Sequence, residues 1–244
     1  MTTRLRVQDL AKTYRRGGAA YGTLRDLLGG SRGARREVRA LDGVDLAVAA
    51  GETLAVIGEN GAGKTTLLKV VARITPPDRG RVEVVGRLSA LIEVGAGFHP
   101  ELTGRENVML HGSILGLARP TLRAAMDDIA DFAGLADALD TPVKHFSTGM
   151  YARLGFAVAV HAGPRVLLVD EVLSVGDEAF RARCYDRIDD LTRSGCAILF
   201  VSHDLAAVER VAARALWLHA GRIREEGAAH DVVAAYRGFV GTAT

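Results

Sequence analysis

The residues with the clearest chemical meaning form one short segment, GENGAGKTT, from Gly58 to Thr66. Its glycines allow the backbone to turn tightly and to bring N–H groups close to phosphate oxygens. Lys64 would supply a positive charge to the β- and γ-phosphates, and the Thr65 hydroxyl would ligate Mg²⁺. The start of the helix expected after the segment would add its dipole. The residues predicted to bind a nucleotide are Gly58, Asn60, Gly61, Ala62, Gly63, Lys64, Thr65 and Thr66.

Two acidic residues, Asp170 and Glu171, follow the apolar run in RVLLVDE. Taken alone, an acidic pair after a strand is more often a polar loop. A phosphate-binding segment earlier in the chain favours a role in nucleotide hydrolysis instead. Asp170 is then predicted to hold Mg²⁺ through water, and Glu171 to orient or deprotonate the attacking water.

A histidine, His203, follows a third apolar run in ILFVSHD. An isolated histidine is usually structural or merely exposed. However, ligands bind at the carboxyl edge of open parallel sheets, and a residue directly after a buried strand lies at that edge. We therefore predict that His203 contacts the γ-phosphate and acts in catalysis with Lys64 and Glu171.

Short apolar runs without polar alternation predict strands that are buried on both faces. They are Leu54–Ile57, Val166–Val169 and Ala197–Val201. Helical stretches fall between them, so an α/β fold with a mainly parallel sheet is expected. A second, smaller antiparallel sheet is predicted from Leu5–Val7, Val44–Val48, Arg81–Val85 and Leu216–Leu218.

The pattern changes between residues 95 and 163, where helical spacing dominates, as in Thr121–Ala133 and Met150–Val160. We interpret this stretch as an inserted helical subdomain. Residues 1–94 and 164–244 are predicted to form the nucleotide-binding core with its β subdomain. The whole chain of 244 residues is then one domain.

The overall charge is close to neutral: 31 basic and 29 acidic residues give +2. Nucleic acid is therefore not an expected partner. Residues 15–39 are a local exception, because seven arginines against two acidic residues give +5 there. The simplest interpretation of this basic segment is a solvated face.

The two cysteines have no metal-binding spacing, which indicates a reduced, intracellular compartment. The first residues, MTTRLRVQDL, contain no secretory apolar core. No apolar run approaches the roughly 20 residues that span a bilayer. A soluble protein is expected, which would work at a membrane only through a partner.

The segment KHFSTGMYARLGFAVAV places Ser147, Thr148 and Gly149 at the start of a predicted helix. This is another anion-binding arrangement and, taken alone, an ordinary helix cap. Together with the phosphate segment, RVLLVDE, LSVGD and VSHD, it gives an order of motifs that resembles the nucleotide-binding domain of ABC transporters. The resemblance covers nearly the whole chain. FSTGM, which ends at Met150, stands where that family has its LSGGQ signature.

The resemblance implies a P-loop NTPase (RecA-like) core that binds and hydrolyses ATP with Mg²⁺. Tyr14 matches the aromatic residue that stacks on adenine, and Asp177 matches the D-loop aspartate. Two copies would close head to tail on two ATP molecules. The signature residues Ser147–Met150 of one copy would then contact the γ-phosphate bound by Lys64 of the other. A separate integral membrane permease is also implied, with this chain at the cytoplasmic face of the plasma membrane.

A narrower resemblance joins LIEVGAGFHPELTGRENV, FSTGMYARLGFAVA and VDEVLSVGD to the ATPases that drive polysaccharide export, such as that of O-antigen, teichoic acid or capsule. The basic segment, Arg15–Arg39, also resembles that subfamily, where it lies near the cytosolic substrate entrance. Arginines there would attract the pyrophosphate of a lipid-linked glycan. Two features depart from the family. Glu93 stands near the usual position of a glutamine, and the chain ends at Thr244 without the sugar-binding β domain of longer members, so it is not expected to recognise a glycan terminus itself.

Other classes of function remain open at this point. An ABC ATPase of translation or DNA maintenance generally has tandem domains or long coiled-coil arms, and this chain has neither. A regulator without hydrolysis would usually lack one of Lys64, Asp170, Glu171 and His203, which are all present. An ABC transporter ATPase with another substrate is the third alternative.

Overall fold

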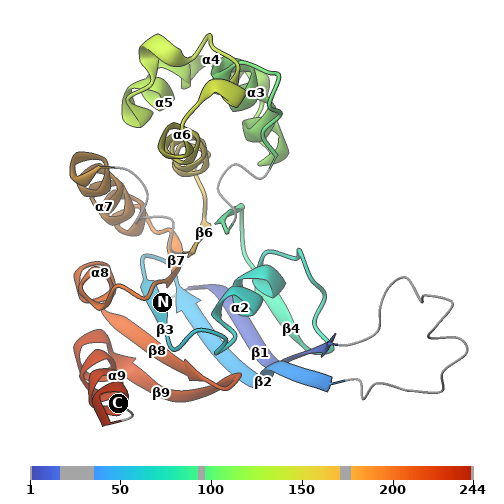
Figure 1. The fold of residues 1–244 in the computed structure, drawn as a ribbon, viewed down its shortest axis with the longest axis vertical. Helices are drawn as coiled ribbons and strands as arrows, with labels where there is room; N and C mark the ends of the chain where they lie inside the picture. Colours follow the sequence, from blue (N-terminus) through green and yellow to red (C-terminus); the bar gives the residue numbers. More distant parts are fainter. Residues whose placement is uncertain (1, 17–35, 93–96, 171–176, 243–244) are drawn as a thin grey trace, which may run out of the picture.

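Two β-sheets and a separate group of helices make up the fold (Figure 1). The computed structural model describes residues 2–16, 36–92, 97–170 and 177–242. Within these ranges, no helix has both the length and the apolar character needed to cross a bilayer.

Among the described residues, the larger sheet has six strands, in the spatial order β5 (Leu88–Leu91), β6 (Val166–Asp170), β7 (Ala197–Val201), β3 (Thr53–Ile57), β8 (Arg214–His219) and β9 (Arg222–Ala228). Neighbouring strands are parallel, except that β8 and β9 are antiparallel. The expected mainly parallel sheet is therefore confirmed. The three predicted buried strands are its neighbours β6, β7 and β3, whose side chains are almost all buried.

The prediction that Leu216–Leu218 belongs to the smaller sheet is wrong. These residues lie in β8, which pairs in parallel with β3 so that Leu216 is opposite Val56. A run of three apolar residues identifies a buried strand, but its pairing partner depends on the path of the whole chain. The edge strand β9, RIREEGA, was not predicted because it is mostly polar and exposed.

The smaller sheet is antiparallel, as expected, with the order β2 (Arg36–Ala49), β1 (Thr3–Arg16) and β4 (Arg79–Val84). The strands β1 and β2 have 14 residues each and are much longer than the apolar runs predicted from the sequence. Their outer halves are polar, and the pairing of the two strands extends them beyond the apolar core.

The larger sheet lies between two apolar layers. Ala55 and Ile57 of β3 belong to the same core as three helices that Figure 1 shows on one side of the sheet. Leu54 and Val56 point to the opposite core, which the sheet shares with another helix and the smaller sheet. The first three helices are α7 (Glu178–Arg193), α8 (Leu205–Val211) and α9 (Ala229–Thr242), and the other is α2 (Lys64–Val71).

The helical subdomain has its own apolar core, which includes Val108, Ile129 and Leu154. Its helices are α3 (Gly104–Ile114), α4 (Arg119–Ala124), α5 (Met126–Ala133) and α6 (Thr148–His161). The helical stretch predicted at Thr121–Ala133 is present as two helices, because the chain bends at Ala125. The bend lets α4 pack Leu122 against Gly112 of α3 while α5 faces α6.

Candidate functional site

The carboxyl ends of three neighbouring parallel strands bring several predicted residues to one edge of the larger sheet. Asp170 ends β6 and pairs with Val201 of β7, which also pairs with Val56 of β3. With neighbouring strands spaced by about 4.8 Å, Asp170 lies about 10 Å across the sheet from Val56. The phosphate segment starts two residues after Val56, and His203 follows two residues after Val201. Residues more than 100 positions apart therefore meet at the edge where such sheets bind ligands.

The glycines of the phosphate segment have backbone conformations that other residues rarely adopt. Gly58 has φ 150° and Gly63 has φ 111°, and a Cβ atom would collide with the carbonyl oxygen of Leu218 at the first and of Ala40 at the second. Gly61, with φ 82°, has no heavy atom within 4 Å of the position of a Cβ. The loop is thus packed tightly against the protein at its two ends and faces open space in its middle, as a phosphate cradle requires.

Lys64 is the first residue of α2 and is only 7% exposed. Its Nζ donates hydrogen bonds to the carbonyl oxygens of Gly58 at 2.6 Å and Glu59 at 3.0 Å. The preceding residue, Gly63, caps α2 without a side chain, so the first N–H groups of the helix have no side-chain acceptor at this cap. A buried ammonium beside such N–H groups suits the phosphates of a nucleotide.

A magnesium ion fits the residues at this edge. Thr65 is exposed in the first turn of α2, and Asp170 is partly exposed at the end of β6. Among the described residues, no group of three or more His, Cys, Asp or Glu residues could hold a metal ion. Mg²⁺ needs no such cage, because it keeps several waters and takes one or two protein oxygens together with phosphate oxygens.

His203 is exposed and stands in a turn fixed by its neighbours. The Asp204 backbone N–H donates to Ser202 Oγ at 3.0 Å, and the Asp204 side chain caps α8 by accepting from the N–H groups of Ala206 and Ala207. These bonds hold the backbone on both sides of the imidazole, which gives His203 a defined place at the sheet edge.

The signature residues start α6 in the helical subdomain, away from the phosphate segment at α2 (Figure 1). Ser147 caps the helix, with Oγ accepting from the Met150 N–H at 3.2 Å. Ser147 and Thr148 are exposed. A Cβ at Gly149 would have Ser147 Oγ as its nearest neighbour, at 3.8 Å. Nothing inside the described chain therefore requires a glycine at this position.

Tyr14 lies on β1, opposite Val38 of β2, and is 38% exposed. Two residues further along β2, the carbonyl of Ala40 packs against Gly63 of the phosphate segment. The smaller sheet therefore carries an accessible aromatic ring on the same strand pair that touches the loop, as stacking on a base requires.

Asp177 caps α7, accepting from the Phe180 N–H at 2.7 Å. Its Oδ2 also lies 3.9 Å from Nη1 of Arg153, which follows the signature on α6. Arg153 could not be selected from the sequence, because only the fold brings α6 beside the start of α7.

Some of the predicted features lie outside the described residues. These are Glu171, Glu93 and residues 17–35 of the basic segment.

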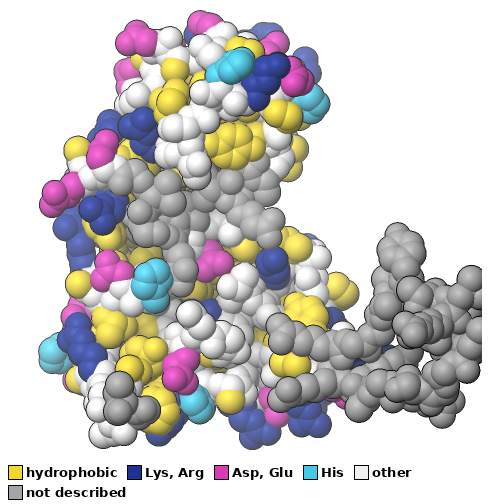
Figure 2. Space-filling model, viewed as in Figure 1, with side chains coloured by type: hydrophobic (Ala, Val, Ile, Leu, Met, Phe, Trp, Pro, Cys, Tyr) yellow, Lys and Arg dark blue, Asp and Glu magenta, His cyan; other side chains and the backbone are white. Residues whose placement is uncertain are grey.

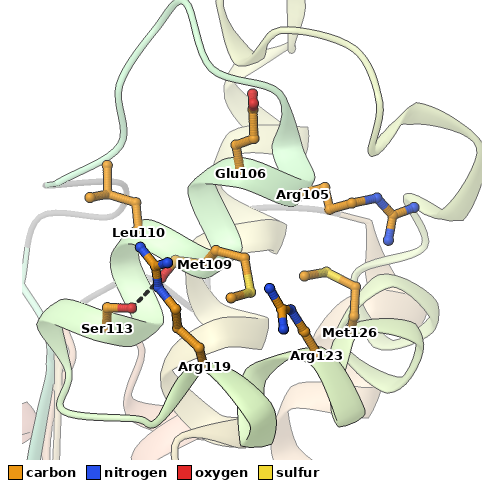
Figure 3. Close-up of a pocket in the computed structure, with 8 residues that line it drawn as sticks. All are labelled: Arg105, Glu106, Met109, Leu110, Ser113, Arg119, Arg123 and Met126. Carbon is orange, nitrogen blue, oxygen red and sulfur yellow. Dashed lines mark hydrogen bonds between the residues drawn. The ribbon is translucent and has the colours of Figure 1, made fainter.

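A pocket of about 540 Å³ lies between α3 and α4 of the helical subdomain (Figure 3). Met109, Leu110 and Met126 form its apolar floor, and Leu110 is 37% exposed. Arg119 and Arg123 point into it from α4, and neither has an acidic partner among the described residues. No sequence motif marks this pocket, since its lining comes from three helices, with Met126 at the start of α5.

The rim of this pocket also carries charged side chains that are already paired. Arg105 forms an ion pair with Asp140 at 2.9 Å. Glu106 belongs to a capping box, and the hydrogen bond from the Thr103 backbone N–H lowers the pKa of Glu106, so this carboxylate stays charged near neutral pH. The charges left for a ligand or partner are therefore positive.

The fold and the loop at the sheet edge define a P-loop nucleotide-binding domain. Residues 41–174 match the family model described as ABC transporter. This match covers more than half of the chain, which therefore belongs to the ABC transporter family.

Curated relatives are ATP-binding proteins of export systems. The chain is 43% identical to the O-antigen export system ATP-binding protein RfbB of Klebsiella pneumoniae, over 83% of this chain and 82% of the relative. It is 41% identical to RfbB of Myxococcus xanthus, over 95% of this chain and 55% of the relative. It is 42% identical to the teichoic acids export ATP-binding protein TagH of Levilactobacillus brevis, over 97% and 65%. The chain thus spans most of the Klebsiella protein but only about half of the Myxococcus protein.

Solved structures share the fold. An ATP-binding subunit of an ABC transporter superposes with a TM-score of 0.78 at 24% identity, over 96% of this chain and 93% of that chain. A dimeric ATP-binding cassette bound to ADP and Pi superposes with a TM-score of 0.76 at 19% identity, over 92% and 98%.

Proposed function

We propose that this chain is the ATP-binding and ATP-hydrolysing subunit of an ABC transporter that exports a polysaccharide. The observation that carries the proposal is the buried Lys64, held in a glycine cradle at the same sheet edge as Asp170 and His203. Membership of the ABC transporter family supports the reaction, and relatives named for O-antigen and teichoic acid export support the substrate class.

The residues at the sheet edge have complementary tasks in this proposal. Lys64 binds the β- and γ-phosphates, and Thr65 and Asp170 hold Mg²⁺, which neutralises the developing negative charge. Glu171, directly after Asp170, orients the attacking water and accepts its proton. His203, two residues after the end of β7, binds the γ-phosphate, and Tyr14 stacks on the adenine.

The signature residues complete the site of a second copy of the chain. Ser147 and Thr148 are exposed and Gly149 and Met150 are partly exposed at the start of α6, where the helix dipole favours an anion. No described residue packs closely enough against Gly149 to require a glycine there. A glycine at this position is explained if a phosphate bound by another copy approaches it from outside. Two copies would then close head to tail, each supplying a signature to the nucleotide bound by Lys64 of the other. The relationship to a dimeric cassette fold supports this arrangement.

The subunit is proposed to work at the cytoplasmic face of the plasma membrane with a separate membrane permease. The pocket between α3 and α4 suits a segment of that permease, because an apolar floor beside Arg119 and Arg123 complements an acidic, amphipathic helix. In the basic segment, Arg32 and Arg35 would attract the pyrophosphate of a lipid-linked glycan.

A paired charge reversal separates these two roles. Arg119→Glu with Arg123→Glu is expected to lower stimulation of ATP hydrolysis by the permease at least about tenfold, because like charges across an interface cost several kcal/mol. Arg32→Glu with Arg35→Glu should keep this stimulation and lower glycan export. Each double variant changes the charge by the same amount and serves as the control for the other. Both should hydrolyse ATP normally without the permease. Unchanged stimulation in the first variant, or unchanged export in the second, contradicts the role given to that cluster.

The affinity for Mg-ATP tests the assignment of Lys64 to phosphate binding. Lys64→Met should weaken Mg-ATP binding by about 10- to 150-fold, because a hydrogen bond to a charged group contributes about 1.5–3 kcal/mol. Equilibrium dialysis with labelled ATP measures the affinity, and Lys69→Met, on the same helix but in its last turn, is the matched control. Equal affinities of wild type and Lys64→Met would contradict the assignment of the loop.

A further inference from the structure

The turn between β8 and β9 lies directly against the phosphate segment. The carbonyl of Leu218 occupies the space that a Cβ at Gly58 would need, and its side chain approaches Gly63. The Gly221 N–H donates to the carbonyl of Ala62 at 3.0 Å. The cradle is therefore supported by the end of β8 and by the turn that follows it, and neither belongs to any of the sequence motifs.

The turn is itself held in a restricted conformation. Ala220 has φ 47°, in the left-handed region that residues with a Cβ rarely adopt. The carbonyl of Gly221 accepts from the Asp42 N–H at 2.9 Å, and Arg222 forms an ion pair with Asp42 at 2.6 Å. These bonds hold the turn on β2, the strand whose Ala40 carbonyl also packs against Gly63 of the cradle.

His219 connects this turn to both the nucleotide site and α9. Its Nδ1 lies 3.4 Å from Oε2 of Glu59, whose own carbonyl accepts from Lys64 Nζ. Its ring also packs edge-on against Phe239 of α9, with ring centroids 5.5 Å apart. The imidazole thus contacts the phosphate segment on one side and the last helix on the other.

The sole tryptophan of the chain lies in the same cluster. Trp217 pairs with Ile57, the residue before Gly58, and its ring centroid is 5.1 Å from that of Phe239. The Arg224 guanidinium lies 4.4 Å from the Trp217 ring centroid and 4.2 Å from that of Phe239. A conformational change in the phosphate segment is therefore expected to alter the environment of the Trp217 indole.

We infer that the β8–β9 turn is a positioning element for the phosphate segment, and that His219 is the positioning residue that couples nucleotide binding to the docking of α9. The inference rests on the proposed nucleotide binding at Lys64. His219 sets the place of Glu59, and Glu59 in turn supplies a carbonyl oxygen to the Lys64 ammonium. Binding of phosphates by Lys64 should therefore alter the surroundings of Trp217.

The test compares two histidine–glutamate pairs in which the same distance, 3.4 Å, separates His Nδ1 from a carboxylate oxygen. His219→Ala should raise the Kd and the KM for Mg-ATP about two- to fivefold, as expected for a partly exposed pair, and leave kcat within twofold. It should also remove most of the change in Trp217 fluorescence on adding Mg-ATP. His219→Gln, which can still donate to Glu59, should recover most of the affinity. His230→Ala removes a histidine–glutamate contact of the same length, 3.4 Å from Nδ1 to Glu209, on α9 away from the loop and should match wild type.

The outcomes distinguish this inference from the proposed function. Wild type that fails to bind labelled ATP in equilibrium dialysis contradicts the proposed function itself. Wild type that binds ATP while His219→Ala keeps the same affinity and the same fluorescence change overturns the inference alone. Equal losses in His219→Ala and His230→Ala also overturn it, because a general loosening of α9 would then explain both. Circular dichroism on all variants establishes that they are folded before these comparisons are made.

Discussion

Replacing Glu171 with glutamine is expected to slow ATP hydrolysis by about 100- to 10,000-fold, the usual contribution of a general base. Asp170, the last residue of β6, lies at the edge where the phosphate segment starts, and Glu171 is the next residue in the sequence. Glutamine has nearly the same shape but cannot accept the proton of the attacking water. Binding of Mg-ATP should persist, because Lys64, Thr65 and Asp170 are unchanged.

Steady-state phosphate release and equilibrium dialysis measure these two properties separately. Glu178→Gln is the matched control, since Glu178 is the next glutamate in the chain and is exposed at the start of α7. Phosphate release by Glu171→Gln within about threefold of wild type would contradict the proposed general base.

The second large effect is expected from Gly149→Asp, which should reduce hydrolysis about 100- to 1,000-fold, as the loss of a transition-state donor does in other enzymes. The described part of the subunit has room for the side chain, because the nearest atom to a Cβ at this position is 3.8 Å away. The new carboxylate would instead repel the γ-phosphate held by the other copy. The affinity of a single copy for Mg-ATP should therefore stay at the wild-type level.

Gly238→Asp makes the same change at an exposed glycine of α9 that also has open space around it. It should hydrolyse ATP like wild type. If Gly149→Asp also retained wild-type hydrolysis, the signature would have no role in the site.

The sequence predicted the centre of the fold better than its margins. The strands β3, β6 and β7 are short, continuous apolar runs, because parallel strands covered on both faces must be apolar throughout. The polar edge strand β9 carries no such signal. Leu216–Leu218 were assigned to the wrong sheet because local composition does not specify which strand lies alongside.

Some residues of the candidate site could likewise be predicted from the sequence, and others could not. The phosphate segment could be found from sequence because its residues are adjacent and each has a required conformation or charge. His219 and Arg153 could not, because their contacts join elements that are far apart in the chain: His219 reaches Glu59, and Arg153 reaches Asp177. The pocket between α3 and α4 has the same origin.

The central claim, that two copies build each hydrolytic site together, is tested most directly by mixing two inactive variants. Lys64→Met lacks a working phosphate segment but keeps its signature, and Gly149→Asp has the opposite defect. A mixed dimer would contain one site in which an intact Lys64 faces an intact Gly149. We predict that mixing restores ATP hydrolysis well above the sum of the two variants measured alone. Hydrolysis that stays at that sum, in samples where cross-linking demonstrates mixed dimers, would contradict the account.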